Sequence, residues 1–183
     1  MNSRTQFEAS ADLTQTILSK LATERGVHAE TAVSAAARMA GTLVLRSCRL
    51  PIEGLTPGSA ILSDQVDELG PKVLKSIDEA LAMLKIGINP KQVNYDIPQG
   101  NVPLKSLLEV QALLDSAFRA ILKQHGLSDE EGAHAAAIST AVLIDKTKGV
   151  LSPQVAYAIA VDGLVAGSKT VPSNAERSDA AAR

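Results

Sequence analysis

Apolar residues recur every three or four positions over most of this 183-residue chain, which is the period of an α-helix. In the clearest stretch, Val73, Ile77 and Leu81 share one helical face, while Lys72 and Glu79 lie on the other. The pattern therefore predicts an all-α fold. Together with start and stop signals, it predicts a bundle of seven helices, over residues 5–24, 29–47, 56–70, 71–87, 103–124, 128–148 and 152–167.

Three proline-containing pairs set several of these boundaries. Residues 56–57 and 152–153 each place a hydroxyl side chain directly before a proline, a combination typical of the first turn of a helix. Residues 70–71 are a glycine followed by a proline, and a proline inside a helix removes a backbone hydrogen bond. We therefore expect one helix to end and another to begin at residues 70–71.

Two segments lack helical periodicity. Residues 88–102 contain two prolines, one glycine and three asparagines, which predicts an extended connector. Connections of this length tend to be functional or mobile. Residues 168–183 are small and polar, and we expect them to form a disordered tail that follows a single domain over residues 1–167.

The chain also resembles itself at a distance of 100 residues. The coinciding positions are Gly26 with Gly126, Glu30 with Glu130, Ala35–Ala37 with Ala135–Ala137, and Leu43 with Leu143. This match predicts two related three-helix units, over residues 5–87 and 103–167, with the first three and the last three of the seven helices in corresponding places. The alternative is that two ordinary helical hairpins share common start and stop residues.

Composition narrows the classes of partner. Hydrophobic residues make up 45% of the chain and charged residues 21%, as in folded globular proteins. The net charge of −2 is spread along the chain, whereas nucleic-acid-binding proteins carry a concentrated basic face. Two Tyr, two Phe and no Trp are too few for a base-stacking platform. We therefore expect no nucleic-acid partner. We also expect no membrane span, because no apolar stretch approaches about 20 residues.

Cysteine usage and the N-terminal residues bear on location. Cys48 is the single cysteine, so the chain can form neither an intrachain disulfide nor a cysteine-based metal site. Free thiols are typical of reducing compartments. The first ten residues also lack the apolar segment of a secretory signal. A cytoplasmic location is expected.

Three residues form the nearest approach to a metal-binding pattern. Glu130 and His134 are four positions apart, so they share a helix face, and His125 precedes the same helix. The alternative is structural: Glu130 suits the first turn of a helix, where its charge complements the helix dipole, and His134 can form a local hydrogen bond. No cofactor is expected.

Three other residues are candidates for binding a ligand. Tyr95 and Asp96 lie in the proline-bounded connector, and loops held by a rigid scaffold often carry binding residues. Asp162 is a lone charge in an apolar helix, where a carboxylate must find a partner or face water. Tyr95 could equally fill the junction of the two units, and Asp162 could lie on an exposed polar edge.

No familiar catalytic motif is present: the chain has no dinucleotide or Walker loop, no HExxH or GxSxG, and no EF-hand loop. The first hypothesis is therefore a non-enzymatic interaction or regulatory protein. A homodimer or another protein partner would cover its nearly all-apolar helices at 29–47, 128–148 and 152–167. The alternative is a protein, either a binding protein or an enzyme, that binds a small molecule or a metal between the two units.

Overall fold

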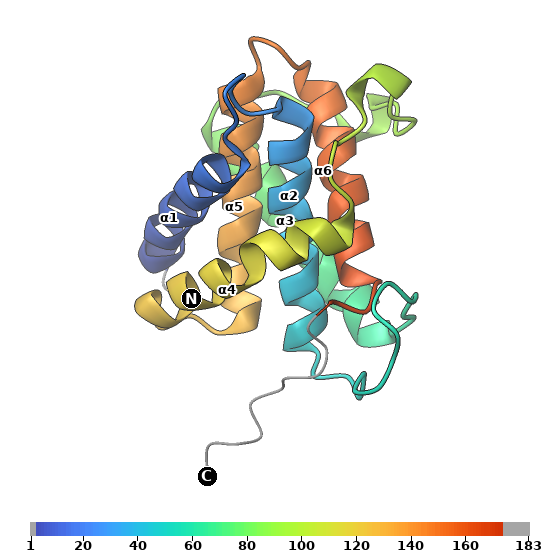
Figure 1. Ribbon diagram of the computed structural model, residues 1–183. Coiled ribbons are helices and arrows are strands. Elements are labelled where there is room, and N and C mark those ends of the chain that lie inside the picture. Colours follow the sequence, from blue (N-terminus) through green and yellow to red (C-terminus); the bar gives the residue numbers. More distant parts are fainter. Residues whose placement is uncertain (1–2, 174–183) are drawn as a thin grey trace.

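The computed structural model describes residues 3–173. That part of the chain is all-α, as predicted, with two short 3-10 turns and no named strand. It contains six α-helices, which are α1 (Ser3–Leu21), α2 (Ala29–Ser47), α3 (Asp64–Met83), α4 (Leu107–His125), α5 (Asp129–Thr147) and α6 (Pro153–Ser168) (Figure 1).

The prediction of seven helices is wrong, because α3 runs through Pro71 without a break. Val66 before the proline and Val73 and Ile77 after it are all buried, so one apolar face continues across it. Packing of that face offsets the single backbone hydrogen bond that Pro71 cannot make.

The predicted helix start at residues 56–57 is also wrong. Gly58 has a φ of 89°, which lies outside the right-handed helical region. Its backbone N–H donates to the Val171 carbonyl at 2.9 Å, and the Ile61 N–H donates to the Lys169 carbonyl at 2.8 Å. Residues 58–61 therefore pair with the segment that follows α6, and α3 begins only at Asp64.

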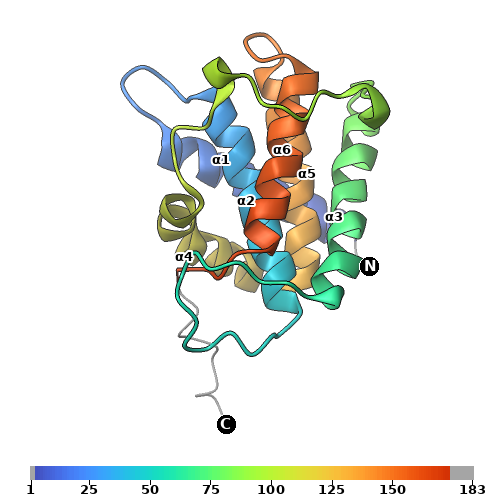
Figure 2. The same cartoon turned by 90° about the vertical axis from the view of Figure 1, so that its right-hand side faces the viewer.

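The centre of the bundle is a close parallel pair, α2 and α6, with α5 beside them (Figures 1 and 2). A Cβ atom built on Gly41 of α2 would lie 2.2 Å from the Leu164 carbonyl oxygen. One built on Gly167 of α6 would lie 2.1 Å from the Arg38 carbonyl oxygen. The two backbones touch, which only glycine permits at these positions.

The remaining helices cover this centre. α1 packs mainly against α5, α4 crosses α1 and α2, and α3 packs mainly against α5 (Figure 2). Almost every residue of α2 from Thr31 to Leu45 is buried as a result. One chain thus covers the apolar surface of its own central helices.

The connector between α3 and α4 crosses one end of the bundle and then runs down its side (Figure 2). It contains 3-10 turns at Pro90–Gln92 and Gln99–Asn101. The Asn101 side chain donates to Glu30 at 2.8 Å, and the Leu104 N–H donates to the Thr31 hydroxyl at 2.9 Å. These contacts fix the connector to the start of α2.

α4 begins at Leu107, later than the predicted residue 103, because Ser106 and Glu109 form a capping box there. At the other end of the chain, residue 168 still belongs to α6 and Val171 is fully buried, although a disordered tail is expected from residue 168. The Ser173 N–H donates to Gln111 of α4 at 3.2 Å. The rest of that predicted tail, 174–183, lies outside the described residues.

None of the helices between residues 3 and 173 has both the length and the hydropathy that a membrane crossing requires.

Candidate functional site

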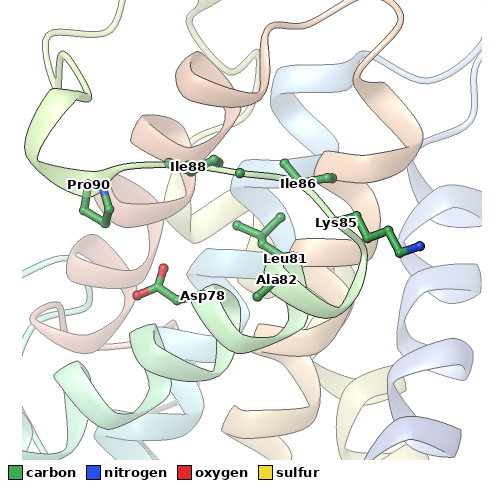
Figure 3. Close-up of a pocket in the computed structure, with 8 residues that line it drawn as sticks. Asp78, Leu81, Ala82, Lys85, Ile86, Ile88 and Pro90 are labelled. Carbon is green, nitrogen blue, oxygen red and sulfur yellow. The ribbon is translucent and has the colours of Figure 1, made fainter.

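The candidate site is a hollow of about 450 Å³ between the C-terminal half of α3 and the connector that follows it (Figure 3). Its wall is largely aliphatic, with one carboxylate and one lysine. The lining residues are Asp78, Leu81, Ala82, Lys85, Ile86, Gly87, Ile88 and Pro90.

A sharp turn at the end of α3 creates this hollow. Lys85 has a φ of 60°, the left-handed conformation that commonly ends a helix. The Ile86 N–H then donates back to the Leu81 carbonyl at 2.9 Å. The chain therefore reverses and carries Ile86 and Ile88 across the end of α3, above Leu81 (Figure 3).

The polar feature of the hollow is a hydrogen bond between α3 and α6. The Tyr157 hydroxyl donates to Asp78 Oδ1 at 2.7 Å, and Tyr157 is only 1% exposed. Burial, reinforced by the hydrogen bond and the charge of Asp78, raises the pKa of the Tyr157 phenol well above its ordinary value of 10.0. Tyr157 therefore remains a donor at neutral pH and holds one carboxylate oxygen in place.

No lysine or arginine among residues 3–173 forms an ion pair with the half-buried Asp78. Lys85 lines the same hollow, but its amine points away from the carboxylate (Figure 3). Lys75, on the same helix, pairs with Glu79 instead. The hollow therefore offers a negative charge whose only hydrogen-bond donor from this part of the chain is a neutral phenol.

A second hollow of about 510 Å³ adjoins the first and shares Gly87 and Ile88 with it. Asn89, Gln92 and Gln154 complete its lining, so this side is rich in amide groups. A molecule bound at Asp78 could extend across Ile88 towards these amides.

Of the three predicted ligand-binding residues, only Tyr95 lies near this site. Its hydroxyl donates to the carbonyl of Pro90, a lining residue, at 3.1 Å, and its phenol contributes to the raised pKa of Tyr157. Asp96 and Asp162 are both exposed and line neither hollow.

Asp96 and Asp162 have other surroundings. The Asp96 N–H donates to the Asn94 side chain at 3.0 Å within the connector. Asp162 lies near Arg38 of α2, whose pKa burial lowers, and the Asp162 charge opposes that lowering.

The structure does not bring the three predicted metal ligands together. His125 Nε2 lies 2.8 Å from an oxygen of Asp12 on α1, and His134 Nδ1 lies 2.7 Å from the Ser76 hydroxyl on α3. Glu130 is exposed at the start of α5. Residues 3–173 contain no group of three or more His, Cys, Asp or Glu side chains that could hold a metal ion.

Asp78 and Tyr157 did not emerge from the sequence as candidates. Asp78 reads as a charge at the border of an amphipathic helix, and Tyr157 as one aromatic in an apolar helix. A weak signal is that Tyr157 is one of only two tyrosines, and buried tyrosine hydroxyls usually have a partner. The identity of that partner depends on how α3 and α6 pack.

The fold and the site together define an all-α bundle with an apolar hollow that contains an oriented carboxylate. Comparison of the chain with protein-family models, with curated proteins and with solved structures returned no match. The case for a function therefore depends on the geometry alone.

Proposed function

We propose that the protein binds a small molecule in the hollow between α3 and the connector. The observation that carries this proposal is the Asp78 carboxylate, which the buried Tyr157 hydroxyl orients at the edge of an aliphatic surface. Ligand sites are typically concave, apolar and about 300–1,000 Å³ in volume, with a few placed polar groups. The hollow of about 450 Å³ has these properties.

Its position differs from the predicted one between the two units 5–87 and 103–167, because every lining residue belongs to the first unit or to the connector. α3 and the connector form its wall, and α6 provides Tyr157. A ligand there would contact the end of α3 and the start of the connector, and because it binds the folded state it would raise the melting temperature by mass action.

Gly87 allows a direct test, because a Cβ atom added there meets no atom within 4 Å. We expect Gly87→Phe to fold normally and to obstruct both hollows, since Gly87 lines each of them. Gly100→Phe is the matched control: Gly100 lies on the same connector, a Cβ there also meets nothing, and it lines neither hollow. A thermal-shift screen of metabolites against the three proteins is the measurement.

The proposal predicts compounds that stabilise the original protein and Gly100→Phe but not Gly87→Phe. It is contradicted if no compound stabilises the original protein, or if every stabilising compound acts equally on Gly87→Phe.

We further propose that α1–α3 and α4–α6 are two related units. α2 and α5 are both 19 residues long and begin at Ala29 and Asp129, in the register of the sequence repeat. In this arrangement α1, α2 and α3 correspond to α4, α5 and α6. The contacts between the units are reciprocal: α1 and α3 both contact α5, and their counterparts α4 and α6 both contact α2. The differing starts of α3 and α6 would then be a later divergence.

Self-association stays a prediction, as does a contact with another protein. It was motivated by the apolar helices at 29–47, 128–148 and 152–167. Helices of the same chain cover most of that surface, so a dimer is not needed to bury it. Binding of a small molecule is the function that the geometry supports better.

A further inference from the structure

We propose that the ligand is an organic ammonium compound, whose protonated amine binds Asp78 and whose hydrocarbon part covers the aliphatic wall. This inference deepens the proposed function and rests on it. The groups that line the hollow determine the charge of the ligand.

The surroundings of Asp78 determine the sign of the ligand's charge. Asp78 has no cationic partner between residues 3 and 173, and its bound donor, Tyr157, is neutral. The one cation that lines the hollow, Lys85, points away from the carboxylate (Figure 3). An anionic ligand would be repelled by Asp78, whereas an ammonium group would supply the missing charge and a charge-assisted hydrogen bond.

The lining of the hollow favours an organic cation over a metal ion. One carboxylate cannot replace the hydration shell of a metal ion, and the described residues offer no cluster of three ligating side chains. The surface around Asp78 consists instead of aliphatic side chains, those of Leu81, Ile86 and Ile88 among them. Hydrocarbon of the ligand would displace water from these side chains, which favours binding in proportion to the apolar area covered.

An aromatic residue, Tyr95, lies beside the hollow. Tyr95 donates to the Pro90 carbonyl and lies close enough to Tyr157 to affect its pKa. Tyr95 as a residue is 48% exposed, so it is accessible from solvent beside the site. Aromatic rings attract ammonium groups through their negative faces, which adds to the preference for a cation.

Three probes of equal chain length separate the contributions: n-hexylammonium, hexanoate and 1-hexanol. Titrations followed by backbone amide chemical shifts locate each binding site and give its Kd. We expect hexylammonium to bind more tightly than both other probes and to shift amides of residues 78–90. Asp78→Asn should weaken its binding about tenfold, the size of a lost hydrogen bond to a charged group.

Glu68→Gln is the matched control, because it removes one negative charge from an exposed position of the same helix outside the hollow. It should leave the Kd for hexylammonium unchanged. Gly87→Phe should abolish the shifts at residues 78–90.

The inference is overturned if hexanoate or hexanol binds as tightly as hexylammonium, if Asp78→Asn leaves the Kd unchanged, or if hexylammonium does not bind. None of these results decides the proposed function. That is decided by the comparison of Gly87→Phe with Gly100→Phe across neutral, anionic and cationic compounds.

Discussion

His134 is buried, and its surroundings determine how its ring titrates. Its ring lies between α5 and α3, with Nδ1 bonded to the Ser76 hydroxyl. Burial lowers its pKa below the ordinary value of 6.5 and outweighs the charges of Glu130 and Glu79, which act in the opposite direction. The folded protein therefore favours the uncharged ring.

This lowered pKa predicts a dependence of stability on pH. The unfolded chain takes up a proton at His134 near pH 6.5, whereas the folded chain resists it until a lower pH. The contribution of His134 is thus complete above pH 6.5 and is lost as the pH falls from 6.5 towards the folded pKa. Denaturant unfolding at a series of pH values from 8 to 5 measures this effect. The free energy of unfolding of the original protein should fall more steeply than that of the His134→Gln variant.

The variant His134→Gln keeps a side chain that can bond to Ser76 but does not titrate. The other histidines and the carboxylates are common to both proteins and cancel in the difference between them. Parallel pH profiles for the two proteins would contradict the assignment of a buried neutral ring.

Close contact between α2 and α6 is the main feature at the scale of the elements. Gly41 and Gly167 let the two backbones meet. Gly163 lies against Ala37, and a Cβ atom built on Gly163 would lie 3.1 Å from the Ala37 Cβ atom. Approach at this distance gives extensive van der Waals contact without large side chains. This explains how a chain with no tryptophan and few aromatics builds a dense core.

We predict that Gly167→Ala destabilises the protein by about 3 kcal/mol or more, because the added methyl group would overlap the Arg38 backbone carbonyl. Gly149→Ala is the control: this glycine lies in an exposed turn where a Cβ meets nothing. The control should lose no stability and should gain up to about 1 kcal/mol. Urea denaturation measures both, and similar values for the two variants would refute the close packing.

The all-α fold and most of its helices could be predicted from the sequence, but some helix boundaries could not. The periodic pattern, with its start and stop signals, located α2 and α5 within one residue of their observed bounds. It failed at Pro71, where burial on both sides of the proline keeps α3 continuous. It failed again at residues 56–57, because the pairing of residues 58–61 with 169–171 joins segments that are distant in sequence.

The candidate site was less predictable than the fold. Tyr95 was predicted as a candidate because it lies in a proline-bounded connector, and the structure places it beside the hollow. Asp78 and Tyr157 become recognisable only when α3 packs beside α6. The predicted metal ligands share a stretch of sequence but point to different partners, Asp12 for His125 and Ser76 for His134. Spacing alone does not determine such partners.

At the scale of the whole molecule, the two halves of the chain depend on each other. α1 and α3 pack mainly against α5, which belongs to the second half, while α6 packs mainly against α2, which belongs to the first. Neither half therefore holds the main packing partners of its own helices.

This dependence predicts the behaviour of fragments 1–105 and 106–183. Each alone should show weak helical circular dichroism and no cooperative thermal transition, since isolated helices of this length are marginal in water. An equimolar mixture should recover helicity and a transition. A fragment that unfolds cooperatively on its own would show that the halves are independent.

The proposed ammonium site at Asp78 is tested most directly by a crystal structure of the protein grown with saturating n-hexylammonium. We expect the nitrogen of the amine within hydrogen-bonding distance of the Asp78 carboxylate and its alkyl chain against Ile86 and Ile88, with the Tyr157 hydrogen bond intact. An empty hollow, or an amine bound only elsewhere on the bundle, would contradict it.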